Sequence, residues 1–208
     1  MKILFLVSSM QGGGAERVAA LLANAWAEHG HNVTLMPTFS ARGECVYSLH
    51  AAVHLNFLSD HCEPGAGRLA RLMMLRRFIR SFNPDVIVSF LPHVNVAAIL
   101  AAGGLSIPVV ACERIYPPVY EHLLPRPYRA LRKLLYRFAA ALVGQTQLAS
   151  EWLRARGGKA IIATIPNPVL LPLPRTEPHL SPDLLVPPEA RLLLWVGRLD
   201  DQKRPELL

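Results

Sequence analysis

A glycine-rich turn near the start of the chain is the first segment whose residue types could do chemistry. Gly12, Gly13 and Gly14 follow an apolar run and precede Ala15-Glu16-Arg17. Glycines let a ligand approach the backbone, and the free N–H groups and positive dipole end of a following helix attract an anion. The turn therefore predicts a site for a phosphate or nucleotide group. The alternative is that the glycines only turn a strand into a helix.

The turn is not a dinucleotide fingerprint of the kind that binds NAD. A GxGxxG motif starting at Gly12 would need a glycine at the position of Arg17. Residues 38–42, at the end of the next predicted strand, also lack the acid that binds a ribose hydroxyl. A redox reaction with NAD is therefore disfavoured.

Two further groups of candidate residues follow predicted strands. His93 comes after the strand at 85–90, and Glu113 and Arg114 come after the strand at 108–112. Open α/β sheets bind ligands beyond the carboxyl ends of their strands, so these side chains could contact a polar ligand. A lone histidine is more often a surface or helix-capping residue. For Glu113 and Arg114 the alternative is an ion pair within the protein.

A second phosphate-binding signal lies near the end of the chain. Residues 192–197 form an apolar run typical of a buried strand, and the cations Arg198 and Lys203 follow it. The alternative for this turn is a solvated loop.

The elements that position these residues alternate between strand and helix. Residues 3–9 form a continuous apolar run, typical of a strand buried on both faces of a parallel sheet. A helical spacing follows from Ala15 to Gly30, and residues 32–39 form the next strand. Further strands are predicted at 53–58, 85–90, 108–112, 141–145 and 161–165, and helices at 68–82, 95–102, 128–139 and 148–155. This alternation predicts an α/β fold with a doubly wound, Rossmann-like parallel sheet of seven strands.

Changes in residue composition along the sequence divide the 208 residues into three parts. Residues 1–170 are predicted to form one Rossmann-like domain. Prolines are dense in residues 171–190, which predicts a stiff interdomain linker. Residues 191–208 are predicted to be the opening strand and turn of a second domain.

Composition narrows the function classes. The formal net charge is +7 and the pI is near 9.8, which favours a phosphate-rich partner or an anionic membrane surface. Basic and aromatic residues do not interleave, so nucleic acid is not an expected partner. The three cysteines lack a CxxC spacing, which argues against a disulfide framework or a zinc ribbon. We expect neither a membrane span nor a signal peptide, and therefore a cytoplasmic protein.

Two predicted helices combine cations with large apolar residues. One carries Arg68, Arg71, Arg76, Arg77 and Arg80, and the other carries Arg126, Arg129, Arg132, Lys133 and Arg137. A helix of this kind can rest on anionic lipid, and each surface cation contributes about 1 kcal/mol. The alternative is an ordinary helix whose apolar stripe faces the sheet and whose arginines face water.

Five segments, in order along the chain, resemble the retaining GT-B glycosyltransferases of family 4. They are most similar to bacterial enzymes that extend lipid-linked oligosaccharides or O-antigen-type glycans. The segments are Gly12 to Val18, Ser89 to Asn95, Glu113-Arg114, Ile165 to Pro168, and Val196 to Leu199 followed by Lys203.

The resemblance implies two Rossmann-like domains, the first for the acceptor and the second for a UDP- or GDP-linked sugar. It assigns Gly13 and Gly14 to the approach of the donor phosphate and the transferred sugar. It assigns the basic pair near the end of the chain to the departing nucleotide diphosphate. The predicted catalytic residues are His93, Glu113 and Arg114, and the predicted acceptor-side residues are Glu16 and Asn95.

The implied reaction transfers a hexose or N-acetylhexosamine to a polyprenyl-diphosphate-linked or saccharide acceptor. The resemblance implies retention with the departing phosphate as the proton acceptor, so that no strong protein base is required. No cofactor is expected. No metal is expected either, because Asp200-Asp201 lacks the intervening residue of a DxD motif. The implied location is the inner face of the cytoplasmic membrane, as a peripheral protein in polysaccharide biosynthesis.

Two other functions stay open. A UDP-sugar 2-epimerase has a similar double-Rossmann shape, but the glycine turn and the basic pair argue against it. A non-enzymatic sugar-binding domain of periplasmic type is disfavoured because no signal peptide is expected.

Overall fold

The computed structural model describes residues 1–39, 45–121 and 124–169, together with 171, 186, 187, 189 and 191. Internal contacts divide the chain into Met1–Pro168 and Val169–Leu208. The first unit holds every helix and strand considered below. The predicted linker and second-domain opening fall almost wholly outside the described residues, as do Arg198 and Lys203. The three-part domain division therefore stays a prediction.

The first unit is built on one sheet of seven parallel strands in the order β3-β2-β1-β4-β5-β6-β7. The strands are β1 (Lys2–Val7), β2 (Asn32–Pro37), β3 (Val53–Leu55), β4 (Val86–Phe90), β5 (Val109–Cys112), β6 (Ala141–Gly144) and β7 (Ile161–Thr164). The predicted fold class and the seven strands are confirmed. The strand order reverses between β1 and β4, so their carboxyl ends form the switch point where doubly wound sheets bind ligands.

Most strands end one to three residues before the predicted position. The clearest case is β3, which was predicted to reach residue 58 and ends at Leu55. The chain there leaves the sheet and forms the short 3₁₀ helix η1 (Leu58–His61). Its first residue, Leu58, is buried, so the apolar side chain that suggested a strand is packed in a helical turn instead.

In the part of the chain that the structure describes, six α-helices connect the strands. They are α1 (Gly14–Glu28), α2 (Arg68–Phe82), α3 (Pro92–Ala102), α4 (Pro117–Glu121), α5 (Arg126–Leu135) and α6 (Gln147–Arg154). The bounds of α2 are as predicted. α3 begins three residues earlier than predicted because Pro92 occupies its first turn, where a missing N–H is tolerated. The predicted helix at 128–139 is α5 followed by the 3₁₀ helix η2 (Tyr136–Phe138).

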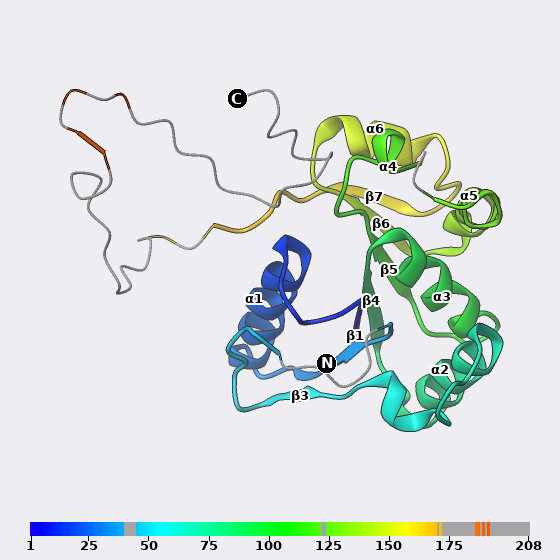
Figure 1. Ribbon diagram of the computed structural model, residues 1–208. Coiled ribbons are helices and arrows are strands. Elements are labelled where there is room, and N and C mark those ends of the chain that lie inside the picture. Colours follow the sequence, from blue (N-terminus) through cyan, green and yellow to red (C-terminus); the bar gives the residue numbers. More distant parts are fainter. Residues whose placement is uncertain are drawn as a thin grey trace. The chain divides into compact units, whose positions relative to one another are not determined.

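The helices cover the two faces of the sheet unequally. Figure 1 shows α1 on one side and α2, α3 and α5 on the other. Successive side chains of β1 point to opposite faces of the sheet. Leu4 and Leu6 join the core with α2 and α3, whereas Phe5 joins the core with α1. The ring of Phe5 lies 5.2 Å from Trp26 and 4.8 Å from Phe90, which ties α1 to β4 across that second core.

Candidate functional site

The carboxyl ends of β1 and β4 meet at His93. Its ring Nε2 lies 3.1 Å from the Oγ of Ser8, the residue that follows β1. The ring of Phe39 stands edge-on to the imidazole, with 4.6 Å between the ring centres. Burial lowers the pKa of His93, which favours the neutral imidazole. A neutral imidazole can donate one hydrogen bond and accept another, so this side chain suits a polar ligand at the switch point.

A strained residue directs His93 to this position. Leu91 has φ 78° and ψ 145°, a conformation that side chains rarely adopt. Its carbonyl accepts the first helical hydrogen bond of α3 from the Asn95 N–H, at 2.9 Å. The bend lets α3 begin directly after β4, so that His93 faces the end of β1. Strain of this kind is typical of functional sites.

The glycine turn lies at the start of α1. Gly12 and Gly13 have φ values of 135° and 148°, where other residues are strained. The Tyr47 hydroxyl accepts a hydrogen bond from the Gly13 N–H at 2.9 Å and donates one to the Gly13 carbonyl at 2.7 Å. The Glu16 carboxylate lies against Gly13 and accepts a hydrogen bond from the Ser9 hydroxyl at 3.0 Å.

This geometry bears on the predicted roles of the turn. The N–H of Gly13 already has a partner, whereas a methyl group added to Gly14 would meet nothing within 4 Å. The space beside the exposed Gly14 is therefore open. The donor-side roles of Gly13 and Gly14 and the acceptor-side role of Glu16 stay predictions.

Glu113 and Arg114 point to different places. Glu113 is 1% exposed, and its Oε1 lies 2.8 Å from Nη2 of Arg132. Arg114 lies over the ring of Phe90 at 4.3 Å and donates a hydrogen bond to Asn167. Glu113 thus has an ion pair within the protein, but with Arg132 and not with its neighbour. Its buried position does not favour a contact with substrate, while the half-buried Arg114 stays at the edge of the sheet. Both catalytic roles stay predictions.

Asn95 is also buried, which the sequence did not indicate. Its side-chain amide donates to the carbonyl of Cys112 and to the hydroxyl of Tyr136, both at 3.1 Å. Its Oδ1 accepts a hydrogen bond from Ser89 at 2.7 Å. With these partners inside the domain, Asn95 is placed to hold α3 against β4 and β5. The predicted acceptor-side role stays untested, and this position does not favour it.

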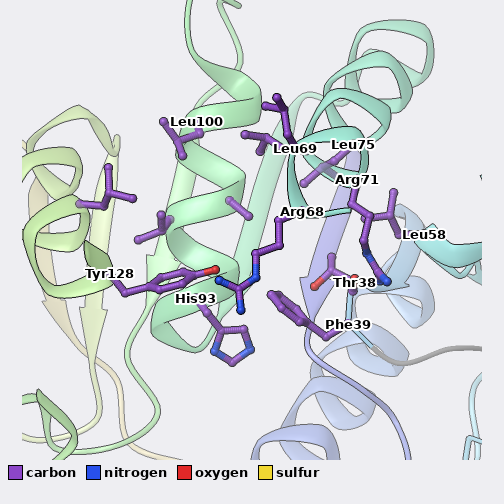
Figure 2. A pocket seen from close by; sticks show the side chains of 14 residues that line it. Thr38, Phe39, Leu58, Arg68, Leu69, Arg71, Leu75, His93, Leu100 and Tyr128 are labelled. Carbon is purple, nitrogen blue, oxygen red and sulfur yellow. Dashed lines mark hydrogen bonds between the residues drawn. The ribbon is translucent and has the colours of Figure 1, made fainter. Parts of the chain in front are cut away.

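A cavity of about 280 Å³ lies beside His93, between α2, α3 and α5. Figure 2 shows polar and aromatic side chains gathered at one end of it and Leu69, Leu75 and Leu100 toward the other. The first group contains Thr38, Phe39, Arg68, Arg71, His93 and Tyr128, and the apolar walls are Leu58, Leu69, Leu72, Leu75, Val96, Ala97, Leu100 and Leu131. This pocket could not be predicted from the sequence, because its lining comes from several segments that are far apart in the chain.

The two basic helices differ from their predicted form. Arg132 is 2% exposed, so the prediction that it faces an anionic surface is wrong. On α2, Arg71 donates to the carbonyl of Thr38, and Arg76 donates to the carbonyls of Ala101 and Gly103 at 2.9 and 2.6 Å. The cations that stay exposed are Arg68, Arg77, Arg80, Arg126, Lys133 and Arg137.

Large apolar side chains lie exposed on the same two helices and on η2. Leu69 and Met73 of α2 are 69% and 51% exposed, and Leu134 and Phe138 are 49% and 64% exposed. Among the described residues no helix is long and apolar enough to cross a membrane. Within that same part of the chain, no three His, Cys, Asp or Glu side chains are grouped to hold a metal ion.

A comparison with protein families identifies the domain that carries this site. The family described as "Glycosyl transferase 4-like domain" matches residues 13–168. The chain belongs to this family. The resemblance to family 4 glycosyltransferases is thereby confirmed.

A curated relative from Campylobacter jejuni supports the same assignment. It is named GalNAc-alpha-(1->4)-GalNAc-alpha-(1->3)-diNAcBac-PP-undecaprenol alpha-1,4-N-acetyl-D-galactosaminyltransferase. It is 29% identical to this chain over 215 residues, which cover 99% of this chain and 55% of the relative. The chain therefore spans about half the length of the curated relative that it matches.

Solved structures share the fold. Anabaena Alr3699/HepE in complex with UDP and glucose matches with a TM-score of 0.57 and 20% identity, over 79% of this chain and 44% of that one. UDP-N-acetylglucosamine 2-epimerase from Rickettsia bellii matches with a TM-score of 0.55 and 12% identity, over 79% and 44%. Both similarities concern the Rossmann-like fold alone.

Proposed function

We propose that this chain supplies the acceptor side of a retaining glycosyltransferase. The enzyme moves a hexose or N-acetylhexosamine from a UDP- or GDP-linked sugar to a lipid-linked or saccharide acceptor. The observation that carries the proposal is the pocket between α2, α3 and α5, which opens beside His93 at the switch point of the sheet. Membership of the family and the name of the Campylobacter jejuni relative support the same reaction class.

The pocket suits the lipid end of a polyprenyl-diphosphate acceptor. Such a molecule joins an apolar chain to a group with negative charges. The pocket offers apolar walls and, at its polar end, the guanidinium groups of Arg68 and Arg71. Burial of an apolar chain contributes about 0.8 kcal/mol per CH₂, and fixed cations attract the diphosphate. The acceptor sugar would then extend toward His93.

The exposed faces of α2 and α5 suit a membrane surface. Apolar side chains there are accompanied by cations, including Arg77 and Lys133. Each cation near an anionic surface contributes about 1 kcal/mol, and the apolar groups add burial in the interface. We infer a peripheral protein on the inner face of the cytoplasmic membrane, where a lipid-linked acceptor is within reach.

The donor side is proposed from the resemblance. Arg198 and Lys203 would neutralise the departing nucleotide diphosphate, with Gly13 and Gly14 near the transferred sugar. The departing phosphate would accept the proton of the acceptor hydroxyl, so that His93 and Arg114 bind and orient and do not act as strong bases. Neither a metal nor another cofactor is proposed for this step.

A screen of nucleotide sugars tests the proposal. The protein encoded by the complete gene is incubated with UDP- and GDP-linked sugars, with and without a short prenyl-diphosphate-linked sugar. We expect release of nucleotide diphosphate and a lengthened glycan only when a matching donor and acceptor are both present. Epimerisation of the donor without any acceptor would instead support the epimerase, whose fold is similar.

A specific variant links the reaction to the pocket. Replacing the wall residue Leu72 by aspartate should raise the KM for the prenyl-linked acceptor by about tenfold or more, because a charge is unfavourable among apolar walls. The KM for the nucleotide sugar should stay the same. Leu22→Asp on α1 serves as the control, because this partly buried leucine packs in the core on the other face of the sheet.

A further inference from the structure

A buried network of polar side chains lies behind the pocket. Its members are Ser89, Asn95, Glu113, Arg132 and Tyr136, each at most 2% exposed. Glu113 Oε1 accepts hydrogen bonds from Arg132 Nε, at 2.9 Å, and from the Tyr136 hydroxyl. The amide of Asn95 donates to the same hydroxyl at 3.1 Å, and Ser89 donates to Asn95. Side chains from β4, α3, α5 and η2 are therefore linked, directly or through the Tyr136 hydroxyl, to the carboxylate that follows β5.

The network joins two walls of the pocket from the side that faces the sheet. α5 contributes Arg132, next to the wall residue Leu131. α3 contributes Asn95, which lies in the same helical turn as His93. The hydrogen bond between Asn95 and Tyr136 is thus a direct polar link between the first turn of α3 and η2, which directly follows α5.

We propose that Glu113 is a positioning residue for the pocket. Its carboxylate is buried away from the pocket, and it holds Tyr136 and Arg132 so that the first turn of α3 keeps His93 against Ser8. This proposal gives Glu113 an indirect role, as an alternative to the predicted role at the substrate. The proposal concerns the geometry of this chain and does not depend on sugar transfer.

The buried network is better suited to fixing the positions of its side chains than to stabilising the fold. A buried ion pair is often no more stabilising than apolar residues of the same size, because both charges lose their hydration. Among the described residues, Oε2 of Glu113 and Nη1 of Arg132 have no hydrogen-bond partner. The contacts that Glu113 makes with Arg132 and Tyr136 all converge on Oε1, which fixes the direction of the Tyr136 hydroxyl. Burial raises the pKa of Tyr136, so this hydroxyl keeps its proton and remains a donor.

The test follows the imidazole of His93 by NMR in the 208-residue chain. Its surroundings include the charged Arg68 and Arg71 of α2 and the titratable Tyr128 of α5, and these do not change between variants. Tyr136→Phe removes the hydroxyl and keeps the ring. We expect the His93 pKa to rise toward 6.5 and the contact with Ser8 to be lost, because water gains access to a loosened first turn.

Two further variants make the result decisive. Val33→Ala removes two methyl groups from the core on the other face of the sheet and should leave the His93 titration unchanged while lowering the melting temperature. Glu113→Gln keeps an oxygen acceptor but loses the charge that holds Arg132, so the His93 pKa should rise by less than in Tyr136→Phe. The proposal is overturned if neither network variant changes the titration, or if Val33→Ala changes it equally. Comparison with His93→Gln assigns the signal among the eight histidines.

Discussion

The imidazole of His93 and the hydroxyl of Ser8 lie 3.1 Å apart, although 85 positions separate them in the chain. The contact joins the ends of β1 and β4, the two strands at which the order of the sheet reverses. Because a hydrogen bond across this point requires both strand ends to be in register, it reports directly on the geometry of the candidate site.

The free energy of unfolding should depend on the protonation of His93. Burial lowers its pKa below 6.5, so between that folded-state pKa and 6.5 the unfolded chain binds more protons than the native one. The contribution of neutral His93 to the free energy of unfolding is therefore present in full above pH 6.5. It is lost as the pH falls from 6.5 to the folded-state pKa. In urea unfolding between about pH 5 and pH 7.5, wild type should lose more stability than His93→Gln. Parallel pH profiles for the two proteins would contradict this.

Breaking the ion pair of Glu113 should be strongly destabilising. Arg132→Met leaves a buried carboxylate without its cation and should lower the free energy of unfolding by about 3–5 kcal/mol. Burial already raises the pKa of Glu113, so the loss should shrink at acid pH as the carboxyl becomes protonated.

The double variant Glu113→Leu with Arg132→Met tests whether the charge causes this loss. It should recover much of the stability, since no unpaired charge remains. Arg77→Met on the exposed part of α2 is the matched control and should change stability by less than about 0.5 kcal/mol. Equal losses in Arg77→Met and Arg132→Met, measured by urea unfolding, would refute the role of the pair.

Because the backbone at Leu91 is strained, glycine should be more stable than alanine at this position, which is the reverse of the usual order in a helix. At φ 78° glycine is free of strain and alanine is not, so Leu91→Gly should be more stable than Leu91→Ala by about 1 kcal/mol. At Leu100, inside α3, the usual order applies and glycine should be less stable than alanine by about 1 kcal/mol. Chemical denaturation of the four variants measures both differences. The same order at both positions would show that Leu91 is not strained.

Much of the fold could be predicted because local signals agree with it. α2 covers the residues that the sequence predicted. Gly67 directly precedes the helix, and Asn83, which has a left-handed backbone conformation and is followed by Pro84, ends it. β1 could be recognised from its continuous apolar run, because both of its faces are buried. Helix α4 has two prolines at its start and only five residues, so it gave no periodic signal.

The partners within the site could not be read so directly. Glu113 was expected to act at the carboxyl-end edge of the sheet, but its side chain pairs with Arg132, 19 positions away on α5. One signal was present: Arg132 shares the helical spacing of the buried Leu135 and Tyr136, so a charge lies on the apolar stripe. The pocket gave no comparable signal, because its walls come from three helices whose packing depends on the whole sheet.

Two neighbouring glycines should respond differently to alanine. Gly13 has φ 148°, and an added methyl group would overlap the Glu16 carboxylate, so Gly13→Ala should cost about 1–3 kcal/mol. Gly14 begins α1 and has open space around it, so Gly14→Ala should be neutral or stabilise by up to about 1 kcal/mol. Thermal unfolding of both variants checks this. A larger loss for Gly14→Ala than for Gly13→Ala would contradict the geometry of the turn.

Binding to anionic vesicles should depend on the exposed face of α2 and α5. Arg77→Glu and Lys133→Glu should each weaken co-sedimentation with phosphatidylserine vesicles by about fivefold or more at low salt, since each lost surface cation removes about 1 kcal/mol. Phe138→Ser should weaken it further, because its side chain is 64% exposed and apolar. Lys159→Glu, an exposed cation before β7, is the control and should bind as wild type. If all three charge reversals weakened binding equally, the vesicles would be attracted by the net charge of the protein and not by a defined surface on these helices.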